Sequence, residues 1–479
     1  MKSTEFLAEL KDLENFRDKE ISSIHVDSRE VKKGGIFFAL KGNATDGNDF
    51  ISSALERGAS LVVSDTYQKE IPGIIHFDQL REHLGLFVTR FYKYPSSKLK
   101  TICVTGTNGK TTSVETFSSM SNLLGNKCAY MSTINFSKEG RSVRPSTLTT
   151  PDVLKINENI MEALKHDANY ISMEASSHGL EQHRLVGLDI DYAILTSFSH
   201  DHLDYHGDLE SYKSAKAKLF LELNPKKNII CIDSLFGEKL HSELLKKNAE
   251  SFSVSIKKDA DFQATFDRCS KGLQVNLKTF DKEFSFELAT ISRYLASNVV
   301  CSIAVLILEG VDTESISKVT KQIELPLGRL ERITKQEHII YVDYAHTPAA
   351  LECALKEIRH FHKENIWCLF GCGGERDKEK RAQMGAIAEE FSDFVVLTSD
   401  NPRNEDRNKI INDILSGITN KDKVKIEPDR KVAIQTTISE LNANPERKIL
   451  LVAGKGHENY QEIEGKFYDL NDKHIIESL

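Results

Sequence analysis

The sequence lacks the features of secreted, membrane-spanning and nucleic-acid-binding proteins. Its eight cysteines include no CxxC pair, so we predict neither a disulfide framework nor a zinc knuckle, and a reducing compartment fits. The longest apolar run, residues 299–308, is too short to cross a bilayer. The net charge of −8 argues against a nucleic-acid-binding surface, although local arginines and lysines can still hold small anionic substrates.

No targeting signal is visible in the sequence. Residues 1–13 are amphipathic and charged, without the apolar segment of a signal peptide, so we expect a cytoplasmic protein without membrane insertion. With 40% hydrophobic and 28% charged residues, the composition is that of an ordinary globular protein. The length of 479 residues predicts roughly three domains. From turn-rich and linker-like segments we place them at residues 1–97, 98–326 and 327–479.

The most informative stretch is TGTNGKTT, residues 105–112. A β-prone apolar run precedes it, and a helix is predicted over 113–124. A strand, a glycine-rich loop and a helix in this order cradle phosphates, because backbone N–H groups approach the anion closely. Lys110 would reach the outer phosphates, and the Thr111 hydroxyl would ligate Mg²⁺. The motif is incomplete, since Val104 takes the place of its first glycine, so a simple surface turn is the alternative.

Polar residues follow two further strands predicted in the second domain. Glu174 ends the first of these, where its carboxylate would suit a metal ion beside the nucleotide, or alternatively cap a helix. After the second strand, residues 199–207 carry three histidines and two aspartates. Zinc would suit such a cluster, but we favour a single Mg²⁺ ligand near the phosphates. A helix over 209–223 follows, and its three lysines predict a solvated basic face.

The third domain contains four predicted strands, each followed by a polar loop. The loops are DYAHTP, GCGGERD, SDNPR and AGKGHE, which begin at residues 343, 371, 399 and 453. Helical stretches separate the strands, so we predict a parallel, doubly wound sheet. Ligands bind at the carboxyl edge of such sheets, and four polar loops in succession argue against plain turn chemistry.

These motifs together resemble those of the Mur ligase family, over essentially the whole chain. The most specific are TGTNGKTT, EASSHGLEQHR from residue 174, DHLDYHG from 201, DYAHTP, DNPR from 400 and GKGHE from 454. The resemblance implies an α/β fold with three domains. They are a small N-terminal α/β domain for the UDP end, a central P-loop-type ATPase domain with a mainly parallel sheet, and a C-terminal Rossmann-like domain for the incoming amino acid.

The resemblance also implies a reaction and its participants. The expected enzyme is an ATP-dependent amide ligase of peptidoglycan precursor synthesis. It would join meso-2,6-diaminopimelate to UDP-N-acetylmuramoyl-L-alanyl-D-glutamate through an acyl phosphate, with closure of the third domain over the second to exclude water. The expected cofactors are ATP, Mg²⁺ and CO₂, the last because the family carbamylates the lysine that matches Lys216. We expect a monomer.

Carried over position by position, the resemblance implies five sets of site residues. Those expected at ATP are Gly106, Thr107, Asn108, Gly109, Lys110, Thr111, Thr112, Asn298, Arg329, Asp343 and His346. Those expected at the UDP-muramoyl peptide are Ser28, Asn43, Ala44, Thr45, Thr149, Thr150, Ser176, Gln182 and Arg184. Those expected at diaminopimelate are Arg376, Asp400, Asn401, Pro402, Arg403, Gly454 and Glu458. The metal would be held by Thr111, Glu174, His202 and carbamylated Lys216, and catalysis would rest on Lys110, Lys216, His202 and Glu174.

Arg403 carries the prediction of amino-acid specificity. An arginine fork binds a carboxylate bidentately, and diaminopimelate has a distal carboxylate whereas L-lysine has none. Glu458 and Asp400 would then hold the distal ammonium. A sulfur analogue of diaminopimelate presents the same charged end, so the sequence leaves these two open. L-Lysine as substrate and a sister or folylpolyglutamate-type ligase are rival interpretations, and a P-loop regulatory ATPase is a rival from another class.

The sequence departs from the family pattern at three places. The usual G-x-F-N-x-x-N reads SRYLASN at residues 292–298, which keeps Asn298 but loses the first asparagine. The usual Pro-Gly-Arg reads Leu-Gly-Arg and keeps Arg329. Glu375 stands where aspartate is commoner.

Overall fold

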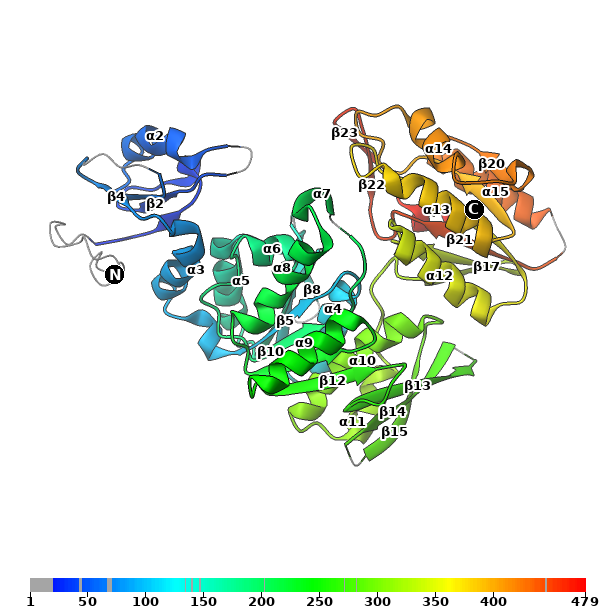
Figure 1. Cartoon of the computed structure of the whole chain (residues 1–479), viewed down its shortest axis with the longest axis horizontal. Coiled ribbons are helices and arrows are strands. Elements are labelled where there is room, and N and C mark those ends of the chain that lie inside the picture. Colours follow the sequence, from blue (N-terminus) through cyan, green and yellow to red (C-terminus); the bar gives the residue numbers. More distant parts are fainter. Residues whose placement is uncertain are drawn as a thin grey trace.

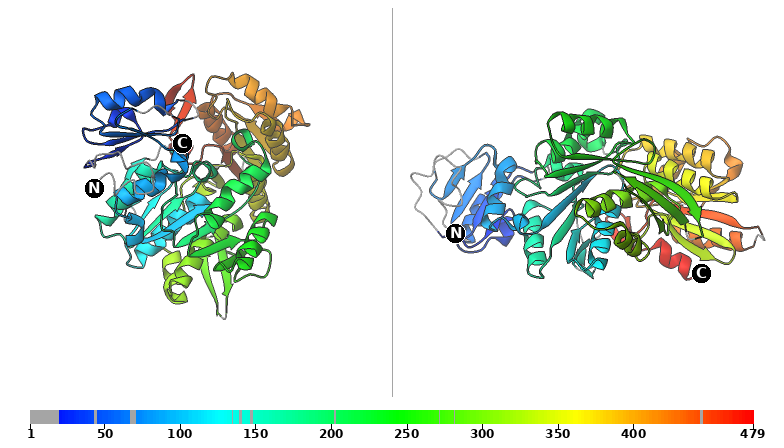
Figure 2. Two further views of the ribbon diagram at one scale, coloured as in Figure 1. Left: turned by 60° about the vertical axis from the view of Figure 1, so that its left-hand side comes forward. Right: turned by 90° about the horizontal axis from the view of Figure 1, so that it is seen from below.

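The structure is a computed structural model of the 479-residue chain. It describes residues 20–42, 45–66, 71–133, 135–138, 141–145, 148–201, 203–270, 272–280, 282–443 and 446–479. Three α/β bodies follow one another along the long axis of the molecule, in the order of the sequence (Figures 1 and 2). In the described ranges, no helix is long and apolar enough to cross a membrane.

The N-terminal body is a small parallel sheet with helices packed against it. Its strands are β1 (Ile24–His25), β2 (Ile36–Ala39), β3 (Leu61–Ser64) and β4 (Ile74–His76), paired in that order. Its helices are η2 (Ser28–Glu30), η3 (Gly47–Phe50), α2 (Ile51–Glu56) and α3 (Leu80–Phe91). Every residue of β2 and β3 is buried, as expected where helices cover both faces of a parallel sheet.

The central body is built on an eleven-stranded sheet. Its order is β15-β14-β13-β12-β11-β10-β5-β9-β6-β7-β8. The strands from β13 through β6 in this order are parallel, whereas β7, β8, β14 and β15 pair antiparallel at the two edges. The bounds are β5 (Lys100–Thr105), β6 (Cys128–Met131), β7 (Asn135–Lys138), β8 (Arg141–Pro145), β9 (Tyr170–Glu174), β10 (Tyr192–Leu195), β11 (Lys227–Cys231), β12 (Ser251–Ser255), β13 (Phe262–Cys269), β14 (Gly272–Thr279) and β15 (Lys282–Leu288).

Helices cover both faces of the central sheet. They are η4 (Pro95–Lys98), α4 (Lys110–Leu123), α5 (Val153–Leu164), α6 (Ser177–Glu181), α7 (Leu203–His206), α8 (Leu209–Leu221), α9 (Leu235–Lys246), α10 (Arg293–Leu308) and α11 (Thr313–Thr320). Alternate residues of β5 reach opposite faces. Ile102 and Val104 join the core beneath α4 and α10, and Cys103 joins the core beneath α5, α8 and α9.

The C-terminal body is a six-stranded sheet in the order β16-β17-β21-β18-β19-β20. Its strands are β16 (Glu331–Lys335), β17 (His338–Asp343), β18 (Asn365–Phe370), β19 (Phe394–Leu397), β20 (Val424–Ile426) and β21 (Lys448–Ala453), and only β16 is antiparallel. Its helices are α12 (Pro348–Phe361), α13 (Glu379–Phe391), α14 (Arg407–Leu415), η5 (Lys421–Lys423), α15 (Arg430–Asn442) and α16 (Asp472–Glu477). A separate hairpin, β22 (Tyr460–Ile463) and β23 (Lys466–Asp469), lies at the edge of this body (Figure 1).

The predicted α/β class with three domains is confirmed. All four strands predicted in the third domain are present, and they pair in parallel. The helix after the phosphate loop begins at Lys110, three residues before the predicted start, with Gly109 as its N-cap. The domain boundaries at 97/98 and 326/327 stay predictions.

Candidate active site

The phosphate loop connects β5 to α4, as the sequence predicted, and its glycines are required by close contacts. A Cβ atom on Gly106 would lie 2.1 Å from Thr196 Oγ1. Gly109 has φ +90°, and a Cβ atom there would lie 2.3 Å from Asn298 Oδ1. Val104, in the place of the missing first glycine, is a fully buried residue of β5. The loop in this chain therefore begins at Gly106, and the place of the missing first glycine, Val104, belongs to strand β5.

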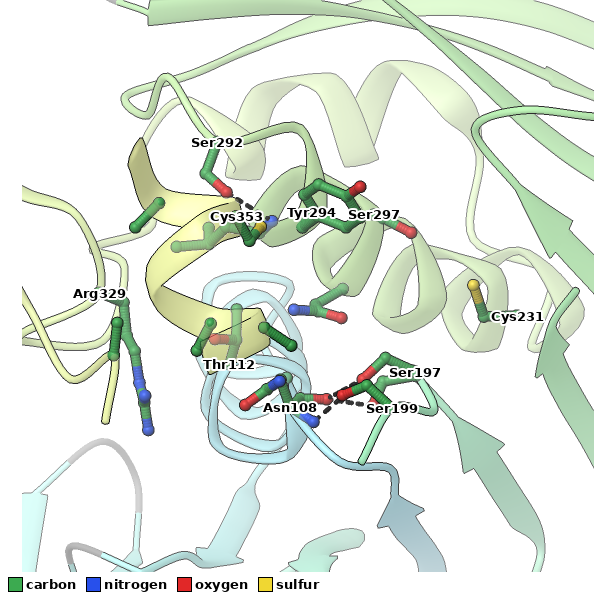
Figure 3. A pocket seen from close by; sticks show the side chains of 18 of the residues that line it. Asn108, Thr112, Ser197, Ser199, Cys231, Ser292, Tyr294, Ser297, Arg329 and Cys353 are labelled. Carbon is green, nitrogen blue, oxygen red and sulfur yellow. Dashed lines mark hydrogen bonds between the residues drawn. The ribbon is translucent and has the colours of Figure 1, made fainter. Parts of the chain in front are cut away.

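A cavity of about 340 Å³ opens beside this loop, between the central and C-terminal bodies (Figure 3). Of the residues expected at ATP, seven line it: Asn108, Gly109, Thr111, Thr112, Asn298, Arg329 and Asp343. The Arg329 guanidinium lies over the Tyr344 ring, 4.7 Å from its centroid. The Asp343 carboxylate accepts hydrogen bonds from the backbone N–H groups of Leu330 and Ala345, at 2.7 and 2.8 Å. These contacts fix the start of the third domain, whose Arg329 and Asp343 line the cavity opposite the phosphate loop.

Sequence reasoning missed part of this cavity. Tyr294 at the start of α10, Cys353 on α12 and Lys257 after β12 also line it. Figure 3 shows Tyr294 and Cys353 at the side of the cavity away from Asn108. Tyr294 belongs to the SRYLASN stretch. Because this stretch aligns with a family motif that contains the ATP-site residue Asn298, its position in the sequence indicates that Tyr294 lies near the nucleotide. Cys353 comes from a helix with no motif, and only the packing of α12 against the central body reveals it.

Glu174 ends β9 directly behind the phosphate loop and is 1% exposed. Its carboxylate accepts hydrogen bonds from Thr111 Oγ1 at 2.8 Å and from the backbone N–H of Thr133 at 2.7 Å. The helix-capping alternative is wrong, because Ser176 caps α6. Carboxylate and hydroxyl oxygens are the ligands that Mg²⁺ takes in proteins, so Thr111 and Glu174 fit the cation. Among the residues that the structure describes, no group of three or more His, Cys, Asp or Glu is arranged to hold a metal ion.

Two lysines converge on one backbone carbonyl of the phosphate loop. Lys110 Nζ donates to Gly106 O at 2.9 Å, and Lys216 Nζ donates to the same oxygen at 2.8 Å. Burial lowers the pKa of Lys110, and it lowers the pKa of Lys216 well below its ordinary value, with the Lys110 charge lowering it further. Lys216 Nζ also lies 4.5 Å from the centroid of the Tyr212 ring.

The predicted solvated basic face of α8 is wrong for Lys216. This side chain is 1% exposed and packs with Tyr212 and Ala215 toward the interior. The side chains of the other two lysines are 28% and 20% exposed, and Lys213 pairs with Glu210 and Lys218 pairs with Glu181. The helix therefore buries one lysine completely and leaves the other two partly exposed in ion pairs.

A second cavity, of about 1060 Å³, joins the central and C-terminal bodies on the other side of Lys110. It contains Lys110 and Lys216 together with residues expected at the muramoyl peptide and at diaminopimelate. From the central body these are Thr149, Thr150, Ser176, Gln182 and Arg184. From the C-terminal body they are Arg376, Asp400, Asn401, Arg403, Gly454 and Glu458. His346, expected at ATP, lines this cavity and not the first one.

Hydrogen bonds order the central side of the second cavity. Thr150 Oγ1 donates to the Glu174 backbone carbonyl at 2.8 Å, which ties the cavity wall to the strand end behind the phosphate loop. Arg184 donates to Gln182 Oε1 at 2.7 Å, and Gln182 Nε2 donates to the Tyr205 hydroxyl at 3.0 Å. These hydrogen bonds therefore orient Thr150, Gln182 and Arg184 at the wall of the second cavity.

The opposite side of this cavity carries groups of both charges. Asn401 Nδ2 donates to Glu458 Oε2 at 3.0 Å, and the fully buried Lys455 Nζ donates to the same oxygen at 2.7 Å. Gly454 has φ +112°, and a Cβ atom on it would lie 2.5 Å from Asp400 Oδ2. Arg403 lies close by, so this end of the cavity can hold both a carboxylate and an ammonium.

Some expected residues are not brought to either cavity. Ser28 and Thr45 lie in the N-terminal body, and Gly106, Thr107, Glu174 and Pro402 support the cavities without lining them. Asn43, Ala44 and His202 lie outside the described residues.

Comparison with known proteins gives the class to which this fold and site belong. Residues 20–92 match the model of the Mur ligase family, catalytic domain; residues 104–306 match the Mur ligase middle domain; and residues 328–456 match the Mur ligase, glutamate ligase domain. The chain belongs to the Mur ligase family.

Individual relatives cover nearly the whole chain. The chain is 37% identical to a UDP-N-acetylmuramoyl-L-alanyl-D-glutamate--2,6-diaminopimelate ligase from Aquifex aeolicus, over 96% of this chain and 94% of the relative. A solved structure of an enzyme with that name has a TM-score of 0.71 and 32% identity, over 96% of this chain and 94% of that one. A folylpolyglutamate synthase from Mycobacterium tuberculosis shares the fold, with a TM-score of 0.66 and 18% identity over 79% of this chain and 93% of that one.

Proposed function

We propose that this protein is the ATP-dependent ligase that adds meso-2,6-diaminopimelate to UDP-N-acetylmuramoyl-L-alanyl-D-glutamate in peptidoglycan precursor synthesis. One observation carries the proposal. A single cavity contains Lys110 of the phosphate loop, the buried Lys216 and the Arg403 loop of the third domain. The near full-length likeness to a ligase of that name supports it. A nucleotide phosphate, a carboxylate and a diamino acid could therefore meet in one place.

In the first step, the terminal D-glutamate carboxylate attacks the γ-phosphorus of ATP and ADP leaves. Lys110, at the start of α4, offsets charge on the transferring phosphoryl group, and Arg329 does so from the wall of the first cavity. Thr111 and Glu174 would hold Mg²⁺, which when bound supplies further positive charge to the phosphate oxygens. Positioning and electrostatics are the main contributions of the chain to this step.

In the second step, the amino group of diaminopimelate attacks the acyl phosphate carbon and phosphate leaves. The distal carboxylate binds Arg403, with Arg376 beside it, and the distal ammonium binds Glu458 and Asp400. L-Lysine would bring its ammonium to Arg403 without a carboxylate, and this disfavours it. A sulfur analogue with the same charged end fits equally well, so we leave it as an alternative substrate. Because the acyl phosphate hydrolyses in water, the third domain must cover it.

Lys216 is proposed to act as a carbamate. A neutral amine reacts with CO₂, and burial beside Lys110 favours the neutral form of Lys216. As the N–C bond forms, the nitrogen loses one proton to solvent, and the resulting anionic carbamate can pair with the Lys110 ammonium. It would also supply oxygen ligands to the metal, together with His202.

The remaining roles follow the family pattern. We assign residues 1–97 to the UDP end with Ser28 and residues 43–45, residues 98–326 to ATP and the muramoyl peptide, and residues 327–479 to the amino acid. We further propose a monomer in the cytoplasm.

An omission assay of phosphate release tests the function. The proposal predicts that release requires ATP, the muramoyl dipeptide and meso-diaminopimelate together. It predicts turnover with the sulfur analogue and little with L-lysine. Release that needs neither the dipeptide nor an amino acid would instead indicate a P-loop regulatory ATPase.

A further inference from the structure

The hairpin β22–β23 is attached directly to the loop that carries Arg403. The Arg403 backbone N–H donates to Glu462 O at 3.1 Å, and the Glu464 N–H donates to Arg403 O at 2.8 Å. Arg403 itself has φ +51°, a left-handed conformation that is uncommon for a residue with a side chain. These two backbone hydrogen bonds hold Arg403 in that conformation. The hairpin therefore fixes the position of the Arg403 Cα atom and the direction of its Cα–Cβ bond.

The hairpin also contacts the guanidinium of Arg403. Arg403 Nε lies 3.1 Å from Glu462 Oε2, and Nη1 donates to Gly374 O at 2.8 Å. A Cβ atom on Gly373, a residue of the cavity wall, would lie 3.1 Å from Arg403 Nη1. With Nε and Nη1 each held by a protein acceptor, the guanidinium plane has one orientation. Arg403 lines the second cavity and Glu462 does not, so the carboxylate holds the arginine from outside the cavity.

Glu462 reaches a second cavity residue through its backbone. Its N–H donates to Asn401 Oδ1 at 3.0 Å. With that oxygen occupied, the amide group of Asn401 is oriented so that Nδ2 donates to Glu458 at 3.0 Å. One residue of the hairpin is therefore bonded to both Asn401 and Arg403.

From these contacts we propose that Glu462 is a positioning residue for the distal carboxylate of the amino-acid substrate. Glu462 holds Arg403 at Nε and Gly374 O takes one hydrogen of Nη1. Nη2 and the second hydrogen of Nη1 remain to bind the substrate carboxylate. The inference rests on the proposed function, because it requires a substrate with a distal carboxylate.

A purely structural role accounts poorly for this ion pair. The side chains of Arg403 and Glu462 are 20% and 24% exposed, and partly exposed ion pairs contribute little to stability. The benefit lies in ordering a long side chain before the substrate arrives, since freezing a flexible arginine during binding weakens affinity about three- to tenfold. Discrimination against L-lysine also depends on a guanidinium that stays in place.

Steady-state kinetics of Glu462→Ala tests the proposal. We expect the KM for meso-diaminopimelate to rise about three- to tenfold, with kcat, the KM for ATP and the melting temperature unchanged. Glu462→Gln keeps an oxygen acceptor for Nε and should recover most of the loss. Glu464→Gln is the matched control on the same hairpin, because it removes one negative charge at a residue that meets Arg403 only through its backbone.

A double-mutant cycle identifies the route of the effect. If Glu462 acts through Arg403, Glu462→Ala has no further effect on the diaminopimelate KM in an Arg403→Ala background. An equal effect in both backgrounds, an unchanged KM in Glu462→Ala, or the same loss in Glu464→Gln would overturn the inference alone. Wild-type protein that gives no diaminopimelate-dependent phosphate release would overturn the proposed function and the inference together.

Discussion

Lys110 and Lys216, which are far apart in the sequence, donate hydrogen bonds to the same oxygen, the Gly106 carbonyl, at 2.9 and 2.8 Å. Two ammonium groups in this arrangement repel each other in a buried setting, where charge is poorly screened. The chain therefore keeps a lysine whose protonation is opposed by its surroundings. Such a group is expected at a site of chemistry rather than at a site that stabilises the fold.

The first prediction concerns the activity of Lys216. Lys216→Ala should abolish ligation, and added bicarbonate should not restore it, because the variant has no amine to carbamylate. Lys213→Ala, on the same helix but paired with Glu210 at the surface, should retain wild-type turnover. Both are measured by phosphate release, and wild-type-like turnover of Lys216→Ala would remove the carbamate from the mechanism.

The second prediction concerns stability and pH. The pKa of Lys216 is lowered in the folded protein, so the unfolded chain binds more protons between that lowered value and 10.5. In CO₂-free buffer the free energy of unfolding should consequently rise with pH within that window. Lys216→Met removes the buried amine, so it should stabilise the fold near neutral pH and flatten this dependence. Urea unfolding at several pH values measures both, and an identical pH dependence in the two proteins would contradict the account.

The third prediction concerns the amino-acid pocket. Arg403→Ala should raise the KM for diaminopimelate strongly while the KM for ATP stays nearly unchanged, because Arg403 lines the second cavity and not the first. Equal weakening of both substrates would show that the assignment of this pocket is incorrect.

The fourth prediction concerns the ion pairs that hold the Arg403 loop. Arg381 is completely buried and donates to Glu405 at 2.7 Å and to Asp413 at 2.8 Å. Arg381→Met removes the closest cation from Glu405, whose side chain is 12% exposed and whose next cation, Lys378, is 4.0 Å away. The variant should cost about 3 kcal/mol of unfolding free energy, mainly through Glu405. The chain's single tryptophan, Trp367 on β18, lies in the same body, so its fluorescence reports this unfolding.

A matched surface pair provides the control for Arg381. Arg359 and Asp393 form an ion pair in the same body, and their side chains are 39% and 44% exposed. Arg359→Met should cost less than about 1 kcal/mol. Equal losses in the two variants would mean that burial of Arg381 adds nothing to the interaction.

The sequence alone was sufficient to predict the strands of the second and third domains and the polar loops at their ends. TGTNGKTT between an apolar run and a helix, and four polar loops after four apolar runs, are local patterns with a direct structural meaning. The two cavities could not be predicted from local sequence patterns. Lys213, Lys216 and Lys218 are alike in sequence, and only the packing of α8 distinguishes the buried one. Cys353 and Glu462 reach their sites through contacts between distant elements, which leave no local signal.

Isotope transfer from the substrate carboxylate tests the central claim most directly. The account predicts that a muramoyl dipeptide labelled with ¹⁸O in its terminal D-glutamate carboxylate transfers one labelled oxygen to each phosphate released, in the presence of ATP and meso-diaminopimelate. This follows because the carboxylate attacks the γ-phosphorus and the amine then expels that phosphate from the carbonyl carbon. Released phosphate without label would contradict an acyl phosphate formed in the cavity that Lys110, Lys216 and Arg403 share.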